Sequence, residues 1–227
     1  MKATKLAIAL LTATGISTMA LPVMAYEAGD WLIRGRILNV NPNDDSGLLF
    51  AGAPLASIAG SGVTVDDDTI PELDITYMIT PNWGVELILG YSEHDVNASG
   101  TVKTLLGQVI EAKALPPTLT LQYHFAPNSN IRPYVGAGVN YTYFFDEQVT
   151  GPLNQPGAKV KMDDSFGFAV QAGVDIAINA DWFVNLDVKY IEMDTTAKFS
   201  GVNLVGQAEI DVDVNPVVWG VGIGRRF

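Results

Sequence analysis

The sequence predicts an all-β fold, an eight-stranded antiparallel transmembrane β-barrel of the outer membrane, and three observations lead to this prediction. Apolar and polar residues alternate at period two along much of the chain, which is typical of strands whose two faces meet different environments. The composition is apolar, with 48% hydrophobic residues and a mean hydropathy of +0.21, yet no later apolar run is long enough for a spanning helix. Short turns alternate with long connections, as in a barrel threaded through a membrane.

Residues 1–25 are expected to be a cleaved signal peptide. Lys2 and Lys5 precede an apolar stretch at residues 6–21, and small residues follow at a plausible cleavage site. Threonine, glycine and proline residues in this segment weaken the alternative, a transmembrane anchor. We therefore expect residues 26–227 to be exported and to form one domain, a single eight-stranded barrel in the outer membrane of a Gram-negative cell.

The charge of the chain argues against a nucleic-acid partner, which would need a basic surface. Without Lys2 and Lys5, the 13 basic residues fall to 11 against 25 acidic ones, a net charge of about −14 (11 − 25). No cysteine is present, so neither disulfides nor thiolate metal sites are expected. Acidic clusters lie between the predicted strands without the spacing of a calcium loop, so we interpret them as solvated loops: Asp44-Asp45, Asp66-Asp67-Asp68 and Asp163-Asp164.

The first three strands are expected at residues 31–41, 72–79 and 83–94. In the first, Arg34 and Arg36 place the even positions inside the barrel, because charges facing hydrocarbon are costly. A tight turn at Pro81-Asn82 joins the second strand to the third.

The next two strands form a hairpin, residues 115–125 and 132–146, around a short turn at residues 127–130. Each has an apolar face with aromatic residues near its ends and aliphatic residues between them, as expected of strands that face lipid. The last three strands are expected at residues 165–176 and 182–190 and at the end of the chain from residue 217. Four long loops connect the strands on the side opposite the turns: 42–69, 95–112, 147–163 and 193–208.

Several of these strands resemble the outer-membrane protein W (OmpW) family, which includes an alkane-uptake porin. The matching segments are LPPTLTLQYHF (115–125), RPYVGAGVNYTYFFDE (132–147), SFGFAVQAGVD (165–175), DWFVNLDVKYI (181–191) and the terminal GVGIGRRF (220–227). The resemblance implies a narrow hydrophobic channel for passive uptake of small hydrophobic molecules, with lateral release into the membrane. It implies as partners small hydrophobic solutes, outer-membrane lipid and lipopolysaccharide, and the assembly machinery that reads a final strand ending in Phe227.

An eight-stranded barrel is just wide enough for its own side chains to fill it, so the alternative is a plugged barrel. The predicted channel-lining residues are apolar and point inward: Leu32, Leu38, Val40, Met78, Ile88 and Phe144. Ile210, Val212 and Val214 join them if the last strand has no bulge before Pro216. A small packed core inside the barrel would explain the same residues. Inward glycines leave room for a channel, but they also relieve strain in a curved wall.

Pro116 and Pro117 are the candidate site of a lateral gap. Neither has an N–H, so two hydrogen bonds are missing from a wall without free edges. The missing bonds favour an opening toward lipid. The alternative is that the prolines only end the strand.

The inward polar residues carry both signs of charge and are expected to pair, because an unpaired buried charge is costly. We interpret them as a polar plug on the periplasmic side that blocks axial flow: Arg34, Arg36, Glu72, Asp74, Glu86, Gln122, Arg132, Asp175, Asp187 and Lys189.

An enzyme is not expected. Only His94 and His124 are available as neutral-pH bases, neither lies in a local nucleophile motif, and the sequence has no nucleotide-binding or HExxH motif. We therefore expect no catalytic residues, metal or cofactor. The second functional hypothesis is a closed structural or receptor barrel, such as a surface antigen or a phage or toxin receptor, that does not transport.

Overall fold

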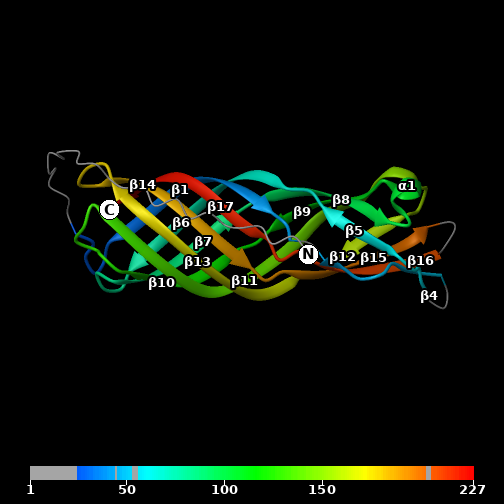
Figure 1. Cartoon of the computed structure of the whole chain (residues 1–227), viewed down its shortest axis with the longest axis horizontal. Coiled ribbons are helices and arrows are strands. Elements are labelled where there is room, and N and C mark those ends of the chain that lie inside the picture. The colour runs from blue at the N-terminus through cyan, green and yellow to red at the C-terminus, as the bar shows by residue number, and fades with distance from the viewer. Residues whose placement is uncertain (1–24, 44, 53–55, 203–205) are drawn as a thin grey trace, which may run out of the picture.

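Eight antiparallel strands close into a barrel in the computed structural model, which describes residues 25–43, 45–52, 56–202 and 206–227 (Figure 1). Hydrogen-bonded neighbours follow one another around the wall, and pairing of the first strand with the last closes the barrel. The prediction of an eight-stranded antiparallel barrel is therefore confirmed. The strands are β1 (Trp31–Asn41), β6 (Asp68–Met78), β7 (Trp83–Gly90), β10 (Thr118–His124), β11 (Ile131–Val149), β13 (Ser165–Ala177), β14 (Trp182–Ile191) and β17 (Val217–Arg226).

The predicted signal peptide lies almost entirely outside the described residues, which begin at Ala25. Within the described part of the chain, no helix is long and apolar enough to cross a membrane. The helical elements there are the single turns α1 (Lys103–Leu106) and η1 (Gly151–Leu153).

The expectation of four long loops was wrong, because most of these residues form further strands. They extend the wall beyond one end of the barrel as two sheets, which Figure 1 shows at the end that carries α1, β4 and β16. Alternation continues there, as in QAEIDVD at residues 207–213, where every second residue is buried. The additional strands are β2 (Asp45–Ser46), β3 (Phe50–Ala51), β4 (Ala56–Ser57), β5 (Ser61–Val65), β8 (Ser92–Gly100), β9 (Gln108–Leu115), β12 (Lys159–Met162), β15 (Asp194–Val202) and β16 (Gly206–Asp213).

The outer face of the barrel carries two girdles of exposed aromatic side chains with aliphatic residues between them, as membrane barrels do. The girdle at the short-turn end, near the C-terminus, contains Trp31, Tyr77, Trp83, Phe125, Trp182 and Phe227. The second girdle, nearer the hairpins, contains Tyr91, Tyr141, Tyr143, Phe166, Phe168 and Trp219. The wall beyond the second girdle therefore extends outside the membrane.

The last predicted strand is β17, and a further strand, β16, precedes it with a break at residues 214–216. Asn215 has a φ of 37°, and its side-chain oxygen accepts a hydrogen bond of 2.9 Å from Met193 N. Despite this break, Ile210, Val212 and Val214 are all buried and face the interior.

The inward residues of β1 divide the interior into three layers along the barrel axis. Leu32, nearest the short turns, lies in an apolar cluster. Arg34 and Arg36 lie in a layer of buried ion pairs. Leu38 and Val40, nearest the hairpins, lie in a large apolar cluster that continues through the extended wall.

Candidate channel and its closed end

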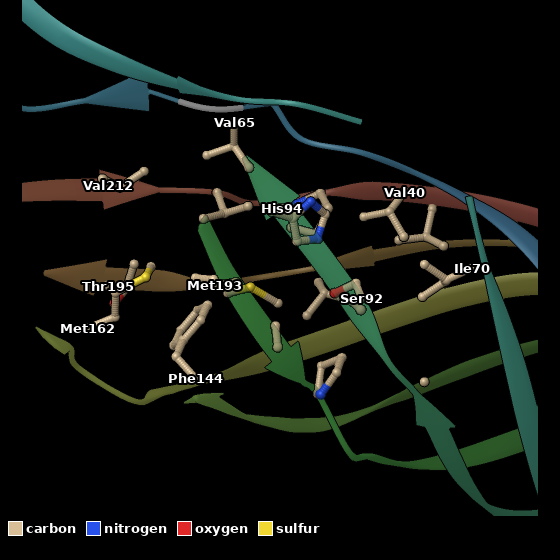
Figure 2. Close-up of a pocket in the computed structure, with 18 of the residues that line it drawn as sticks. Val40, Val65, Ile70, Ser92, His94, Phe144, Met162, Met193, Thr195 and Val212 are labelled. Carbon is tan, nitrogen blue, oxygen red and sulfur yellow. The ribbon is translucent and has the colours of Figure 1, made fainter. Parts of the chain in front are cut away.

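The apolar cluster beyond the ion pairs surrounds an inner cavity with a volume of about 60 Å³. Figure 2 shows side chains from several strands converging on it. Four of the predicted channel-lining residues are in its wall, namely Leu38, Val40, Ile88 and Phe144, together with Ile210, Val212 and Val214. These residues are far apart in sequence, and closure of the barrel brings them together.

A second cavity, with a volume of about 340 Å³, lies inside the extended wall. Val63, Val102, Phe199 and Val202 are among its lining residues, and Ile210 lines both cavities. The sequence interpretation missed this outer cavity because it treated these segments as loops. Their period-two alternation was the signal that could have revealed it.

Leu32 and Met78 do not line either cavity, which corrects the expectation for these two residues. Both are fully buried in the cluster at the short-turn end, against Tyr26 and Phe183. The ion-pair layer separates this cluster from the cavities. Alternation correctly places both side chains inside, but it says nothing about their height along the axis.

The wall beside the inner cavity has an interrupted ladder of hydrogen bonds. The pairing of β7 with β10 ends at Ile88 and Thr118, and the pairing of β8 with β9 begins at Ser92 and Ala114. The register is the same on both sides of this interruption, so residues 89–91 face residues 115–117 without forming ladder pairs. Pro116 explains the missing donor on this side, because it has no N–H, whereas the backbone of Pro117 faces β11.

The ladder on the other side of the prolines has a gap as well, between the pairs Thr118–Asn140 and Leu115–Tyr143, but hydrogen bonds bridge it. Tyr141 N of β11 donates to Pro117 O at 3.1 Å, and the side-chain Nδ2 of Asn140 donates to Pro116 O at 3.2 Å. Pro116 and Gly90, one on each side of the interruption, both line the inner cavity. The interruption therefore lies between the cavity and the outer face.

The interruption is level with the second aromatic girdle. Tyr143 pairs with Leu115 in the ladder, and Tyr91 belongs to the unpaired segment. The rings of Tyr91 and Phe145 have centroids 6.2 Å apart on the outer face. An opening at this height would face the region where hydrocarbon meets polar headgroups.

The ion-pair layer brings nine of the ten predicted plug residues into one network. Arg34 is fully buried and holds Asp175 with two nitrogens, Nη2 at 2.8 Å and Nε at 3.2 Å. Its Nη1 lies 3.2 Å from Glu86 Oε1. The other carboxylate oxygen of Glu86 accepts 2.6 Å hydrogen bonds from Gln122 and Gln171.

Arg36 is the second centre of the network. Its guanidinium lies 2.9 Å from Glu72, 2.5 Å from Asp74 and 3.3 Å from Asp187. Lys189 contacts both oxygens of Glu72 at 2.6 Å. Side chains from several strands thus meet at two arginines, and this buried, cross-linked layer lies between the cavities and the short-turn end.

Arg132 lies closer to the short-turn end than this network. It donates from Nε to Ser129 O at 2.9 Å, and its guanidinium carbon is 4.1 Å from the centre of the Tyr26 ring. It therefore contacts the cluster of Tyr26, Leu32, Met78 and Phe183, with a cation–π geometry toward Tyr26.

Tyr26 is an interior residue that the sequence interpretation missed. The residues before β1 cross the mouth of the barrel, since Tyr26 N donates to Pro127 O in the turn between β10 and β11, on the opposite wall. Its side chain is buried, and its hydroxyl donates to Asp175 Oδ2 at 2.9 Å. No periodic pattern marks so short a segment, so alternation could not have identified this residue.

Replacing Tyr26 with phenylalanine is expected to lower the free energy of unfolding by about 1–2 kcal/mol, because a buried carboxylate loses one hydrogen bond. Urea unfolding of the barrel in lipid vesicles, followed by tryptophan fluorescence, would measure the loss. Tyr141→Phe is the matched control: its hydroxyl contacts Asp164 on the exposed outer face, so no change is expected. Equal effects of the two substitutions would contradict the role of Tyr26 in closing this end.

The two histidines lie on different sides of the ion-pair layer. His124 is buried beside Tyr26, with Nε2 3.2 Å from Gln122 Oε1, whereas His94 lines the inner cavity. The described residues contain no group of histidine and carboxylate side chains placed to hold a metal ion. The lining of both cavities is mainly aliphatic and aromatic, which suits an apolar ligand.

Comparison with known proteins is consistent with this geometry. The OmpW family model matches residues 27–227. Outer membrane protein W of Vibrio cholerae is 37% identical over 209 residues, 91% of this chain and 92% of that protein. The crystal structure of OprG from Pseudomonas aeruginosa superposes with a TM-score of 0.84 at 37% identity, covering 90% of this chain and 99% of OprG. The structure of AlkL in lipid bilayers gives 0.63 at 25% identity, covering 96% and 97%.

Proposed function

Because the chain belongs to the OmpW family of outer-membrane barrels, we propose that it is a passive channel for small hydrophobic molecules. A solute enters the outer cavity, passes the inner cavity and leaves sideways into the membrane. One observation carries this proposal: the interior is apolar from the hairpin end to the interrupted ladder and ionic beyond it. In the usual threading of such barrels the short turns lie on the periplasmic side of the membrane. The apolar part of the interior is then at the end that opens to the cell exterior.

Selection in the proposed channel follows from the solvation of the solute. Apolar surface leaving water gains about 25 cal/mol per Å², and both cavities are lined mainly by aliphatic and aromatic side chains. An ion or sugar would lose hydration without finding matching partners. The extended wall would shield the solute from the polar saccharides of lipopolysaccharide that surround it.

Axial exit to the periplasm is opposed by two successive barriers. In our proposal the ion-pair layer around Arg34 and Arg36 is the first, and the residues leading to β1, which cross the mouth with Tyr26 buried, are the second. Opening this path would break several buried charge pairs, each costly to leave unpaired. A solute in the inner cavity therefore needs another exit.

The interrupted ladder beside Pro116 and Pro117 supplies that exit in our proposal. Gly90 has no side chain to cover the interruption from the opposite strand, and the second aromatic girdle lies at the same height, at the edge of the hydrocarbon. Outer-membrane lipid is then the acceptor. We propose separately that the final strand, which ends at Phe227, is read by the assembly machinery.

A removable cross-link tests lateral exit. The register places Gly90 opposite Pro116, and a Cβ at position 90 would meet only Ile70 Cδ1, at 3.5 Å. The chain has no cysteine, so Gly90→Cys with Pro116→Cys would introduce the one possible disulfide. We expect the oxidised variant to admit a hydrophobic fluorescent probe several-fold more slowly than the unsubstituted protein, because the bond bridges the gap.

The control is the pair Ile75→Cys and Leu87→Cys, which are partners in a part of the wall that is paired on both sides. A disulfide there should leave probe entry unchanged in either redox state. If the oxidised Gly90–Pro116 variant admits the probe as fast as the unsubstituted protein, solute does not leave through this gap.

A further inference from the structure

His94 is a polar residue in the wall of an otherwise apolar cavity. It follows Ser92 on the inward face of β8, and Figure 2 shows its ring among Val65, Val40 and Met193. The remaining polar residues in the lining are Glu72, Ser92, Thr118, Lys189 and Thr195. The cavity therefore contains few groups that could bind a polar atom of a solute.

Most of these polar groups are already paired within the protein. Glu72 and Lys189 bind each other at 2.6 Å. The hydroxyl of Thr118 donates to Pro116 O at 3.1 Å, and that of Thr195 donates to Asp163 O at 2.7 Å. Ser92 adds one small hydroxyl beside His94. The polar part of this wall that can serve a solute is thus centred on His94.

The hydrogen bond of the His94 ring determines what the ring offers. Nδ1 lies 3.1 Å from the backbone oxygen of Asp66. A carbonyl oxygen can only accept, so Nδ1 carries the hydrogen and the Nε2 of the neutral ring has a lone pair. Nε2 can therefore accept a hydrogen bond from a donor in the cavity.

We propose that His94 makes the channel selective for apolar molecules that carry one hydroxyl group, such as long-chain alcohols and phenols. The hydroxyl donates to Nε2 while the rest of the molecule contacts the aliphatic wall. Without this partner, a hydroxyl entering the cavity would lose its hydration uncompensated. A carboxylate gains nothing here, because it has no hydrogen to donate. This inference rests on the proposed uptake function and names its preferred solutes.

The test compares two solutes of the same chain length, radiolabelled n-decane and 1-decanol. Their entry is measured separately, below saturation, in cells with an intact saccharide leaflet that make the full-length protein. His94→Phe keeps an aromatic ring and removes both nitrogens. We expect it to slow entry of 1-decanol about fivefold and to leave n-decane unchanged, since about 1 kcal/mol is typical of one net hydrogen bond.

Two further substitutions separate the roles of the nitrogens. His94→Asn keeps a donor where Nδ1 lies, next to Asp66 O, but removes the distal polar atom. His94→Gln keeps a polar atom at the distal position. We expect asparagine to behave like phenylalanine and glutamine to retain most of the preference for the alcohol. Heat-dependent gel mobility would show that each variant forms the barrel.

The outcomes distinguish this inference from the function on which it rests. If the parent protein admits n-decane but the His94 variants slow both solutes equally, or neither, then His94 does not select hydroxyl groups. The inference also fails if asparagine keeps the preference and glutamine loses it. If the parent protein admits neither solute faster than a plugged barrel does, the proposed channel is wrong and the inference falls with it.

Discussion

Replacing Leu38 and Val40 together by tryptophan is expected to reduce the entry of hydrophobic probes about tenfold or more. Both side chains line the inner cavity, whose volume is only about 60 Å³, and an indole is much larger than either of them. Overpacking of this kind closes free space at a moderate cost in stability. The measurement is the entry rate of a hydrophobic fluorescent probe into cells that make equal amounts of each protein.

Ile37→Trp is the matched control for this pair. Ile37 lies between the two girdles on the same strand, is 56% exposed and points outward, so the same change there leaves the bore untouched. Probe entry should stay at the parental rate. Equal inhibition by Ile37→Trp, or no inhibition by the double substitution, would show that the solute does not pass these residues.

Neutralising Glu86 is expected to lower the free energy of unfolding by about 3–5 kcal/mol, the cost of breaking a buried charge pair from one side. Glu86 is fully buried, contacts Arg34 and accepts hydrogen bonds from Gln122 and Gln171. In Glu86→Gln the side-chain nitrogen is a donor and cannot accept hydrogen bonds from these groups. The substitution therefore removes hydrogen bonds as well as the negative charge. Urea unfolding in lipid vesicles measures the loss.

Asp187→Asn, which removes a partner of Arg36 and Tyr134, should also lower the free energy of unfolding.

Glu111→Gln is the control for Glu86, because it removes the same charge from the extended wall outside the membrane. A side-chain hydrogen bond with Glu93, with repulsion from Glu93 and Asp95, raises the pKa of the Glu111 carboxyl. Neutralising this group removes like-charge repulsion, so its unfolding midpoint should be unchanged or slightly higher. Unchanged stability of Glu86→Gln would contradict the plug.

Period-two alternation predicted the strands well because the two faces of a membrane barrel differ so strongly. Arg34 and Arg36 fixed which face of β1 points inward, and the same reasoning placed Glu86 and Asp187 inside. It also placed Leu38, Val40, Ile88 and Phe144 on the inward face, where the structure finds them in one cavity. The cost of placing a charge in hydrocarbon is large enough to decide orientation from a single strand.

Alternation could not predict position along the barrel axis. Leu32 and Leu38 look alike in sequence, yet the ion-pair layer separates them, because the stagger between strands decides which side chains meet at one height. Tyr26 was missed for a related reason, since its partner Asp175 is 149 residues away and no local pattern marks the contact. The extended wall was missed because acidic residues and glycines were taken as loop signals, although they alternate with buried valine and isoleucine.

The most direct test of the account is the entry of hydrophobic fluorescent probes of graded size into cells with an intact saccharide leaflet. Cells that make this protein are compared with cells that make an equal amount of a plugged barrel of similar size. The apolar cavities and the interrupted wall predict faster entry, with the advantage lost for probes too wide for the inner cavity. Equal entry rates at every probe size would contradict a hydrophobic channel and favour a closed structural or receptor barrel.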